Sequence, residues 1–176
     1  MYRFRIQVRN DKSMKSDNKK TGNKGEELAC GFLKKKGYLI VERNFRTRFG
    51  EIDIVCLDGE KLVFVEVKTK IGHDFGEPEE MVSKSKLAQV QRMGEVFVEM
   101  NNLLVFDSDL PNFSARMPPL RSAQRGYLRQ NSACPAPTNQ IIHNLKWNGR
   151  CRVDVVGIVL NGDMSVETIR HHEAVY

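Results

Sequence analysis

Two carboxylates and a lysine, Asp53, Glu66 and Lys68, lie within two apolar runs that flank the turn signal Asp58-Gly59. Burying a charge among valines and isoleucines costs several kcal/mol unless a partner charge or a metal ion compensates. Carboxylate oxygens are the ligands that Mg²⁺ prefers, and a divalent ion activates water and neutralises the charge of a phosphodiester. These residue types therefore indicate a candidate site for metal-dependent phosphodiester hydrolysis.

The two apolar runs around Asp58-Gly59 predict a β-hairpin. A two-residue loop would place Asp53 opposite Phe64, with Glu66 as its diagonal neighbour, whereas a four-residue loop would place Asp53 directly opposite Glu66. Side chains alternate along a strand with period two, so both registers put Asp53, Glu66 and Lys68 on one face. Only a three-residue loop would separate them.

Each of these side chains suits a distinct role. Because Mg²⁺ keeps several waters, Asp53 and Glu66 are enough protein ligands, with one backbone carbonyl as a further candidate, and Mn²⁺ is the alternative ion. Lys68 lies two residues beyond Glu66, on the same strand face. There it is placed to steer or deprotonate the attacking water, or to stabilise the pentavalent phosphorus.

Length and composition predict one domain of 176 residues, with 40% hydrophobic and 28% charged residues. The net charge of +6 favours a polyanionic partner such as nucleic acid. The chain carries no apolar run near the roughly 20 residues that span a bilayer, and its N-terminus lacks the apolar core of a secretory signal. We therefore expect a cytoplasmic protein with no membrane partner. Four scattered cysteines indicate neither a zinc site nor a disulfide framework.

The chain divides into a basic arm and one domain. Residues 1–22 are rich in lysine and arginine and predict a flexible, solvated arm, and residues 23–176 form the domain. Within the domain, residues 107 to about 150 hold five prolines and no sustained periodicity, which predicts an irregular insertion.

Regular elements are expected on both sides of this insertion. The predicted helices cover 24–36 and a segment that begins near Ser83, and the predicted strands outside the hairpin cover 38–41, 152–160 and 165–169. Gly37 ends the first helix, and Asn161-Gly162 marks a second hairpin.

Basic residues surround the predicted hairpin and are candidate phosphate contacts. Arg43, Arg46 and Arg48 lead into it, and Lys70 follows its second strand. Next to an acidic metal site such cations are well placed to hold phosphates, although solvated surface charges are the simpler interpretation.

Other polar residues are assigned to structure. His171 and His172 are interpreted as surface residues, because adjacent strand residues point to opposite faces and no third metal ligand is evident. Alternation places Arg152 and Asp154 on one face as an ion pair, for which a structural role is at least as plausible as a catalytic one. No nucleotide-binding loop or nucleophile elbow is present in the sequence.

An ordered set of short motifs resembles a known family. The set comprises Gly25-Glu26-Glu27, Gly37-Tyr38, Arg43-Asn44, Gly50-Glu51-Ile52-Asp53, Val63-Phe64-Val65-Glu66-Val67-Lys68, Phe75-Gly76, Lys86 and Arg152-Val153-Asp154-Val155-Val156. It resembles the YraN family of small bacterial proteins, which is similar to the Holliday-junction resolvases within the PD-(D/E)XK, or restriction-endonuclease-like, nucleases.

The resemblance implies an α/β fold with a restriction-endonuclease-like core, in which helices flank a mixed central β-sheet. It implies a catalytic set of Glu26, Asp53, Glu66 and Lys68, with Mg²⁺ or Mn²⁺ at Asp53 and Glu66, and it adds Lys86 to the candidate nucleic-acid contacts. Glu26 fits the helical acid of the resolvase-like pattern better than Glu27. The insertion is the main departure from the family pattern.

Three functions follow as hypotheses. The first is a divalent-metal-dependent endonuclease acting on DNA, with branched DNA among its candidate substrates and a homodimer implied by analogy with resolvases. The second is a nucleic-acid-binding protein that keeps the nuclease fold without turnover. The third is a scaffold whose hairpin acids and Lys68 form internal salt bridges. The intact set of two acids and a lysine favours the enzyme, because acids alone repel phosphates.

Overall fold

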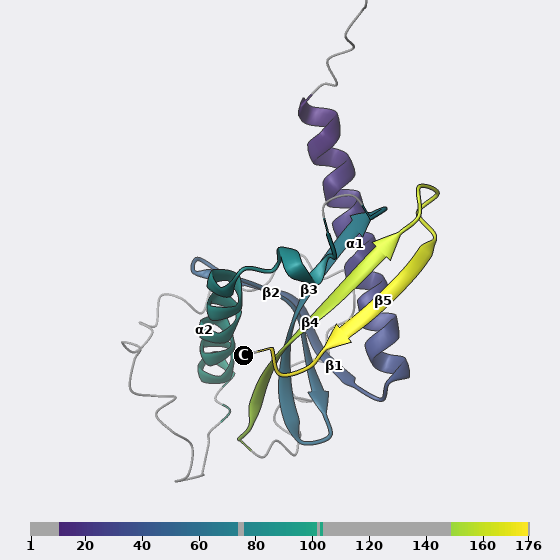
Figure 1. The fold of residues 1–176 in the computed structure, drawn as a ribbon. Helices are drawn as coiled ribbons and strands as arrows, with labels where there is room; N and C mark the ends of the chain where they lie inside the picture. Colours follow the sequence, from purple (N-terminus) through teal and green to yellow (C-terminus); the bar gives the residue numbers. More distant parts are fainter. Residues whose placement is uncertain (1–10, 74–75, 102, 104–148, 176) are drawn as a thin grey trace, which may run out of the picture.

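A five-stranded mixed sheet organises the protein in a computed structural model that describes residues 11–73, 76–101, 103 and 149–175. The strands are β1 (Leu39–Thr47), β2 (Gly50–Asp58), β3 (Lys61–Ile71), β4 (Cys151–Leu160) and β5 (Val166–His172), in that spatial order (Figure 1). Only the β3/β4 pair is parallel, and the other pairs are antiparallel. The predicted mixed sheet flanked by helices is confirmed.

The helices α1 (Asp11–Lys35) and α2 (Lys84–Met100) cover opposite faces of this sheet (Figure 1). Alternation along the hairpin supplies both cores, because Ile54 and Val65 pack with Leu33 of α1 while Val55 and Phe64 pack on the α2 side. The α2 helix begins where the sequence predicts. Ser83 caps it, with Oγ accepting a hydrogen bond from the Lys86 N–H at 3.2 Å.

The α1 helix begins earlier than the sequence predicts. The helix begins at Asp11 rather than near residue 24, so its first turns extend beyond the sheet (Figure 1). Residues 17–20 are exposed, and Lys20 forms an i,i+3 ion pair with Asp17 at 3.8 Å. These turns are polar and carry no apolar stripe, so hydrophobic periodicity did not reveal them. Residues 1–10 of the predicted arm lie outside the described residues.

The β2–β3 hairpin takes the second of the two predicted registers. Leu57 pairs with Leu62 and Ile54 with Val65, which places Asp53 opposite Glu66. An additional pair, Asp58 with Lys61, narrows the turn to residues 59–60, and Gly59 adopts the positive φ of 59° that this turn needs. The two carboxylates lie close enough for Glu66 to raise the pKa of Asp53, and their common face stays a prediction because Ile52 and Ile54, on either side of Asp53, pack in the two opposite cores.

The remaining elements complete the sheet beside the hairpin. After β3, a 3₁₀ turn (Glu79–Met81) precedes α2, and the chain returns as β4 parallel to β3. β1 is longer than predicted and includes Arg43 and Arg46, and β5 extends to His172. The insertion at 107–150 lies outside the described residues except at its end, from 149. Neither helix of the described part has an apolar stretch long enough to span a bilayer.

The α1 helix packs closely against β3 at Gly25, so a substitution there tests this contact. A Cβ at Gly25 would lie 1.7 Å from Thr69 Oγ1, whereas nothing lies within 4 Å of one at Gly31 in the same helix. We expect Gly25→Ala to lower the free energy of unfolding by about 1–3 kcal/mol through overpacking. Gly31→Ala should raise it by about 0.5–1 kcal/mol through helix propensity. Urea denaturation followed by circular dichroism measures both, and equal stabilisation by the two changes would contradict the contact.

Candidate functional site

Asp53 lies where β2 and β3 separate. The backbone pairing of these strands ends at Ile54–Val65, and beyond it Asp53 Oδ2 accepts a hydrogen bond from the Val67 N–H at 2.7 Å. The carboxylate thus satisfies a strand donor that β2 no longer reaches. This contact fixes the orientation of Asp53 without using its second oxygen.

Glu66 is the buried acid opposite Asp53. Its side chain is 8% exposed, and its Oε2 atom lies 3.3 Å from Nζ of Lys86, which comes from the first turns of α2. Burial raises the pKa of Glu66 above its usual range, although the ammonium groups of Lys86 and Lys68 oppose this shift. The sequence predicts Lys86 as a nucleic-acid contact, and the structure places it in direct contact with Glu66.

Asp53 lies beside other acids and has little compensating positive charge. Burial, followed by repulsion from Glu66, raises the pKa of Asp53 to about 7, despite the Val67 N–H. Glu26 adds to this repulsion, and Lys86 reduces it only in part. A cation between the acids would relieve both the desolvation and the repulsion.

A hard divalent ion fits this donor set. Asp53 and Glu66 offer carboxylate oxygens, and Glu66 Oε2 is buried, with the Lys86 ammonium as its partner and no well-directed hydrogen bond from the part of the chain that the structure describes. Within the ranges described, no group of three or more histidine, cysteine, aspartate and glutamate side chains is arranged to hold a metal. An ion here would therefore be held by two carboxylates and complete its shell with water, as Mg²⁺ commonly does.

Lys68 lies near Glu66 on the α2 side of the sheet. Alternation along β3 places Phe64, Glu66 and Lys68 on this face, and the positive charge of Lys68 lowers the pKa of Glu66. Among the described residues, the Lys68 ammonium makes no hydrogen bond or ion pair. Its charge is thus available to a group bound beside Glu66.

Glu26, rather than Glu27, is directed toward the sheet. Its side chain is 16% exposed, and its Oε2 accepts a hydrogen bond from Asn44 Nδ2 at 2.7 Å, with Arg43 Nη2 at 4.0 Å. Glu27 is exposed. Asn44 makes this contact from a left-handed backbone conformation with φ 54°, which asparagine tolerates better than most residues. The predicted helical acid therefore lies near Asp53 and has cationic and amide partners.

The other predicted phosphate contacts lie around this centre. Arg46 Nε pairs with Glu51 Oε2 at 3.0 Å on the surface, and Arg48 lies over the ring of Phe49. Arg46, Arg48 and Lys86 all line a shallow hollow of about 420 Å³. Lys70 instead donates a hydrogen bond to the Gly76 carbonyl, on the loop after β3. The structure thus gathers three of the five predicted cations in the hollow, with Arg43 beside Glu26 and Lys70 at the loop.

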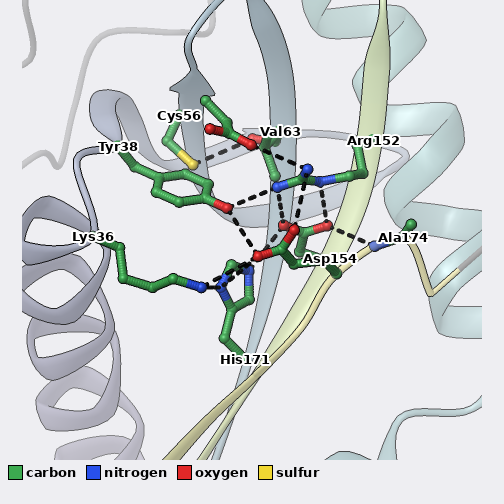
Figure 2. A network of polar contacts seen from close by, with 10 residues as sticks. Lys36, Tyr38, Cys56, Val63, Arg152, Asp154, His171 and Ala174 are labelled. Atoms are coloured by element: carbon green, nitrogen blue, oxygen red, sulfur yellow. Dashed lines mark hydrogen bonds and ion pairs between the residues drawn. The ribbon is translucent and has the colours of Figure 1, made fainter.

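A separate polar network holds the C-terminal strands on the other side of the sheet (Figure 2). Asp154 is completely buried and accepts hydrogen bonds from Nε and Nη2 of Arg152 at 2.9 and 3.0 Å. It also accepts hydrogen bonds from His171 Nε2 at 2.9 Å and from the Ala174 N–H at 3.0 Å. The predicted Arg152–Asp154 ion pair is therefore present.

His171 corrects the sequence interpretation. Its side chain is only 2% exposed, and Nδ1 lies 2.9 Å from the Lys36 ammonium (Figure 2). With Nδ1 accepting that hydrogen bond, Nε2 carries the proton and donates it to Asp154. His172 points to the opposite face, where it contacts Glu79 and is 42% exposed. Alternation correctly separated the two histidines, but it could not show that one of them is buried against α1.

Sequence reasoning missed two features near the carboxylates. The first is Asn44, which orients Glu26. The sequence feature that could have indicated this role is an asparagine inside β1, a strand whose pairing with β2 shifts register between Ile40 and Glu42. The second is Phe49, which is exposed on the tight turn between β1 and β2. The sequence feature that could have indicated it is an aromatic residue between Arg48 and Gly50. Neither role follows from periodicity, because both depend on contacts between elements.

Comparison with known proteins identifies relatives of this chain. A "UPF0102 protein" of Syntrophomonas wolfei is 46% identical over 82 residues, which cover 47% of this chain and 71% of that relative. Relatives of the same name in Caldicellulosiruptor saccharolyticus and Dictyoglomus turgidum are 49% and 41% identical over 78 and 87 residues. These matches cover 44% and 49% of this chain, and 66% and 74% of the relatives.

A family model extends this similarity over β1 to β3 and most of β4. The model of the uncharacterised protein family UPF0102 matches residues 25–158, a range that begins at Gly25 and includes both hairpin carboxylates and most of β4. The resemblance to the YraN family that the motifs indicate is thereby confirmed. The chain belongs to the uncharacterised protein family UPF0102.

Proposed function

We propose that this protein is a divalent-metal-dependent nuclease that hydrolyses phosphodiester bonds in DNA. The observation that carries the proposal is the pair of neighbouring carboxylates, Glu66, which is buried, and Asp53, which is partly buried, with the Lys68 charge beside them. A protein that only binds nucleic acid gains nothing from acids that repel phosphates. The same acids serve a hydrolase, because they concentrate a cation where the substrate charge must be neutralised.

Each side chain of the site has a role in such a reaction. Asp53 and Glu66 would hold Mg²⁺ or Mn²⁺, which when bound activates water and neutralises charge on the phosphate. The Val67 N–H keeps Asp53 in one orientation. Lys68 stabilises negative charge on the phosphoryl oxygens or orients the attacking water. Glu26, held by Asn44, adds negative charge that strengthens the preference for a cation.

Cations beside the acids support DNA as the substrate. Arg46, Arg48 and Lys86 line the hollow next to the carboxylates, and the chain carries a net charge of +6. Arginine and lysine that neutralise phosphates supply most of the sequence-independent affinity for nucleic acid. We include branched DNA among the substrates and a homodimer as the active form, since a resolvase-like enzyme must cut two strands.

One contact favours a second candidate function. Lys86 already pairs with Glu66 at 3.3 Å, so an ammonium neutralises the acid that a metal would otherwise use. A site satisfied in this way suits a nucleic-acid-binding protein that keeps the fold without turnover. The two functions are distinguished by whether the protein cleaves DNA when Mg²⁺ or Mn²⁺ is added.

The test is a cleavage assay on labelled linear duplex, single-stranded and four-way-junction DNA. We expect the wild type to cleave at least one of them with Mg²⁺ or Mn²⁺, and EDTA to abolish the reaction. Glu66→Ala removes half of the metal-binding carboxylates, and it should reduce the rate by at least about 100-fold. Equal residual cleavage by the variant would identify a contaminating nuclease and remove the proposal. Binding of DNA without cleavage would favour the second candidate.

A further inference from the structure

The turn between β1 and β2 presents an aromatic ring to solvent beside the carboxylate site. Phe49 is 46% exposed, whereas Phe45 and Phe64 are buried in the α2-side core at 2% and 1%. Exposing a phenylalanine forgoes about 1.5–3 kcal/mol of burial energy. A single exposed apolar residue needs no explanation by itself, so its surroundings decide whether Phe49 has a function.

The backbone of Phe49 is anchored on both sides. Its N–H donates a hydrogen bond to Thr47 Oγ1 at 3.1 Å, and its carbonyl accepts one from Gln89 Nε2 of α2 at 3.3 Å. Gly50 follows with φ +149°, and a Cβ there would lie 2.7 Å from Gln89 Nε2. The turn is therefore tied to α2, and the ring is presented from a fixed position.

One cation lies over this ring, and two more line the same hollow. The guanidinium carbon of Arg48 lies 4.6 Å from the Phe49 ring centroid, and Arg46 and Lys86 line the same hollow of about 420 Å³. Glu51 is the acid among the lining residues, and it is paired with Arg46 at 3.0 Å. An aromatic face with arginine and lysine on its rim matches the two parts of a nucleotide, a flat base and a charged phosphate.

The hollow adjoins the candidate catalytic centre. Lys86 contributes to both, because it lines the hollow and pairs with Glu66 at 3.3 Å. Glu51 of the hollow is near enough to Glu66 to raise the pKa of that acid. A nucleotide in the hollow would therefore place its neighbouring phosphate next to Glu66 and Lys68.

We infer that Phe49 stacks on an unpaired base of the DNA, while Arg46, Arg48 and Lys86 hold the flanking phosphates. In a paired duplex both faces of each base are already stacked on their neighbours, so the ring has no free face to contact. The preferred substrate is then DNA with unpaired nucleotides, either a single strand or a branch point. This inference rests on the proposed nucleic-acid function and specifies its substrate class.

The test compares Phe49→Ala, Phe49→Trp and Leu39→Ala in the full-length chain. Leu39 is a matched control, because it is an equally exposed apolar residue, at 50%, and lies at the opposite end of β1. Binding is measured by fluorescence anisotropy in EDTA, which prevents cleavage, with a labelled single strand and a labelled blunt-ended duplex of equal length. Circular dichroism confirms that each variant is folded.

Loss of one base–aromatic stack corresponds to about 1–3 kcal/mol, or roughly 5- to 150-fold in affinity. Phe49→Ala should weaken binding of the single strand by a factor in this range and change duplex binding less than about twofold, because only an unpaired base stacks on the ring. Phe49→Trp should retain single-strand binding, and Leu39→Ala should match the wild type.

Two results overturn the inference while leaving the proposed function intact. The first is equal affinity of wild type and Phe49→Ala for the single strand when the wild type cleaves DNA. The second is a shift of oligomeric state in Phe49→Ala with unchanged DNA binding, which would make this turn an interface between copies of the chain. A wild type that neither binds nor cleaves any of the DNAs overturns the inference and the proposed function together.

Discussion

Lys68→Met should reduce the rate of metal-dependent DNA cleavage by about 10²- to 10⁴-fold, the range for loss of a positioned acid–base or charge-stabilising group. Metal binding should persist, because Asp53 and Glu66 are unchanged and a nearby positive charge has been removed. The charge of Lys68 opposes the raised pKa of Glu66, so its loss leaves the carboxylate pair more attractive to a cation. The predicted signature is therefore a lower rate at equal or higher Mn²⁺ affinity.

Glu66→Gln provides the contrasting variant. It removes one of the two carboxylates that we propose as metal ligands, so Mn²⁺ affinity and cleavage rate should fall together. Lys61→Met is the matched control, since Lys61 is an exposed lysine at the opposite end of β3. Single-turnover cleavage gives the rate, and electron paramagnetic resonance of free Mn²⁺ gives the affinity. A parallel loss of rate and Mn²⁺ affinity in Lys68→Met would show that Lys68 supports the site structurally and takes no part in the chemistry.

The closeness of Asp53 and Glu66 could be predicted from sequence, whereas the register of the hairpin could not. Period-two alternation puts Asp53, Glu66 and Lys68 together for either even loop length. The turn signal Asp58-Gly59 left both lengths open, and the added Asp58–Lys61 pair settled the turn at residues 59–60. The prediction that these residues lie together therefore did not depend on the loop length, which the sequence left open.

Contacts between distant elements account for what was missed. The pairing of Lys86 with Glu66 depends on how α2 lies across the sheet, and the burial of His171 depends on α1. A pattern within one element contains no information about either packing. The inward direction of Glu26 likewise depends on the close approach of Gly25 to Thr69, which fixes the rotation of α1. The motif order indicated Glu26 only through the resemblance to a family.

Asp154→Asn should lower the free energy of unfolding by about 3 kcal/mol at pH 7, the lower end of the range for breaking a buried ion pair. Asn keeps the volume of the side chain but loses the charge that accepts from Arg152 and His171. Arg152 retains other partners, with Asp58 Oδ2 at 3.1 Å and Glu173 Oε2 at 3.4 Å, which limits the loss. Thermal unfolding should shift by roughly 6–12 °C for a chain of this size.

The effect of Asp154→Asn should depend on pH in a defined direction. Burial alone would raise the pKa of Asp154, but the hydrogen bonds from His171, Ala174 and Arg152 outweigh it and hold the pKa below its usual value. A carboxyl with a depressed folded-state pKa contributes stability above its unfolded pKa of about 3.9, and that contribution is lost as the pH falls through the folded value. The difference between wild type and Asp154→Asn should therefore be largest near pH 7 and shrink below about pH 4.

Urea denaturation at several pH values measures this difference, and Asp17→Asn is the control because its side chain is 68% exposed in a surface pair with Lys20. That control should change stability by less than about 1 kcal/mol at any pH.

The same variants decide whether Arg152 and Asp154 act in catalysis. Because the network lies on the α1 side of the sheet and Glu66 on the α2 side, Asp154→Asn should cleave DNA at the wild-type rate at temperatures where it is folded. A folded Asp154→Asn protein without cleavage activity would instead place this pair in the reaction.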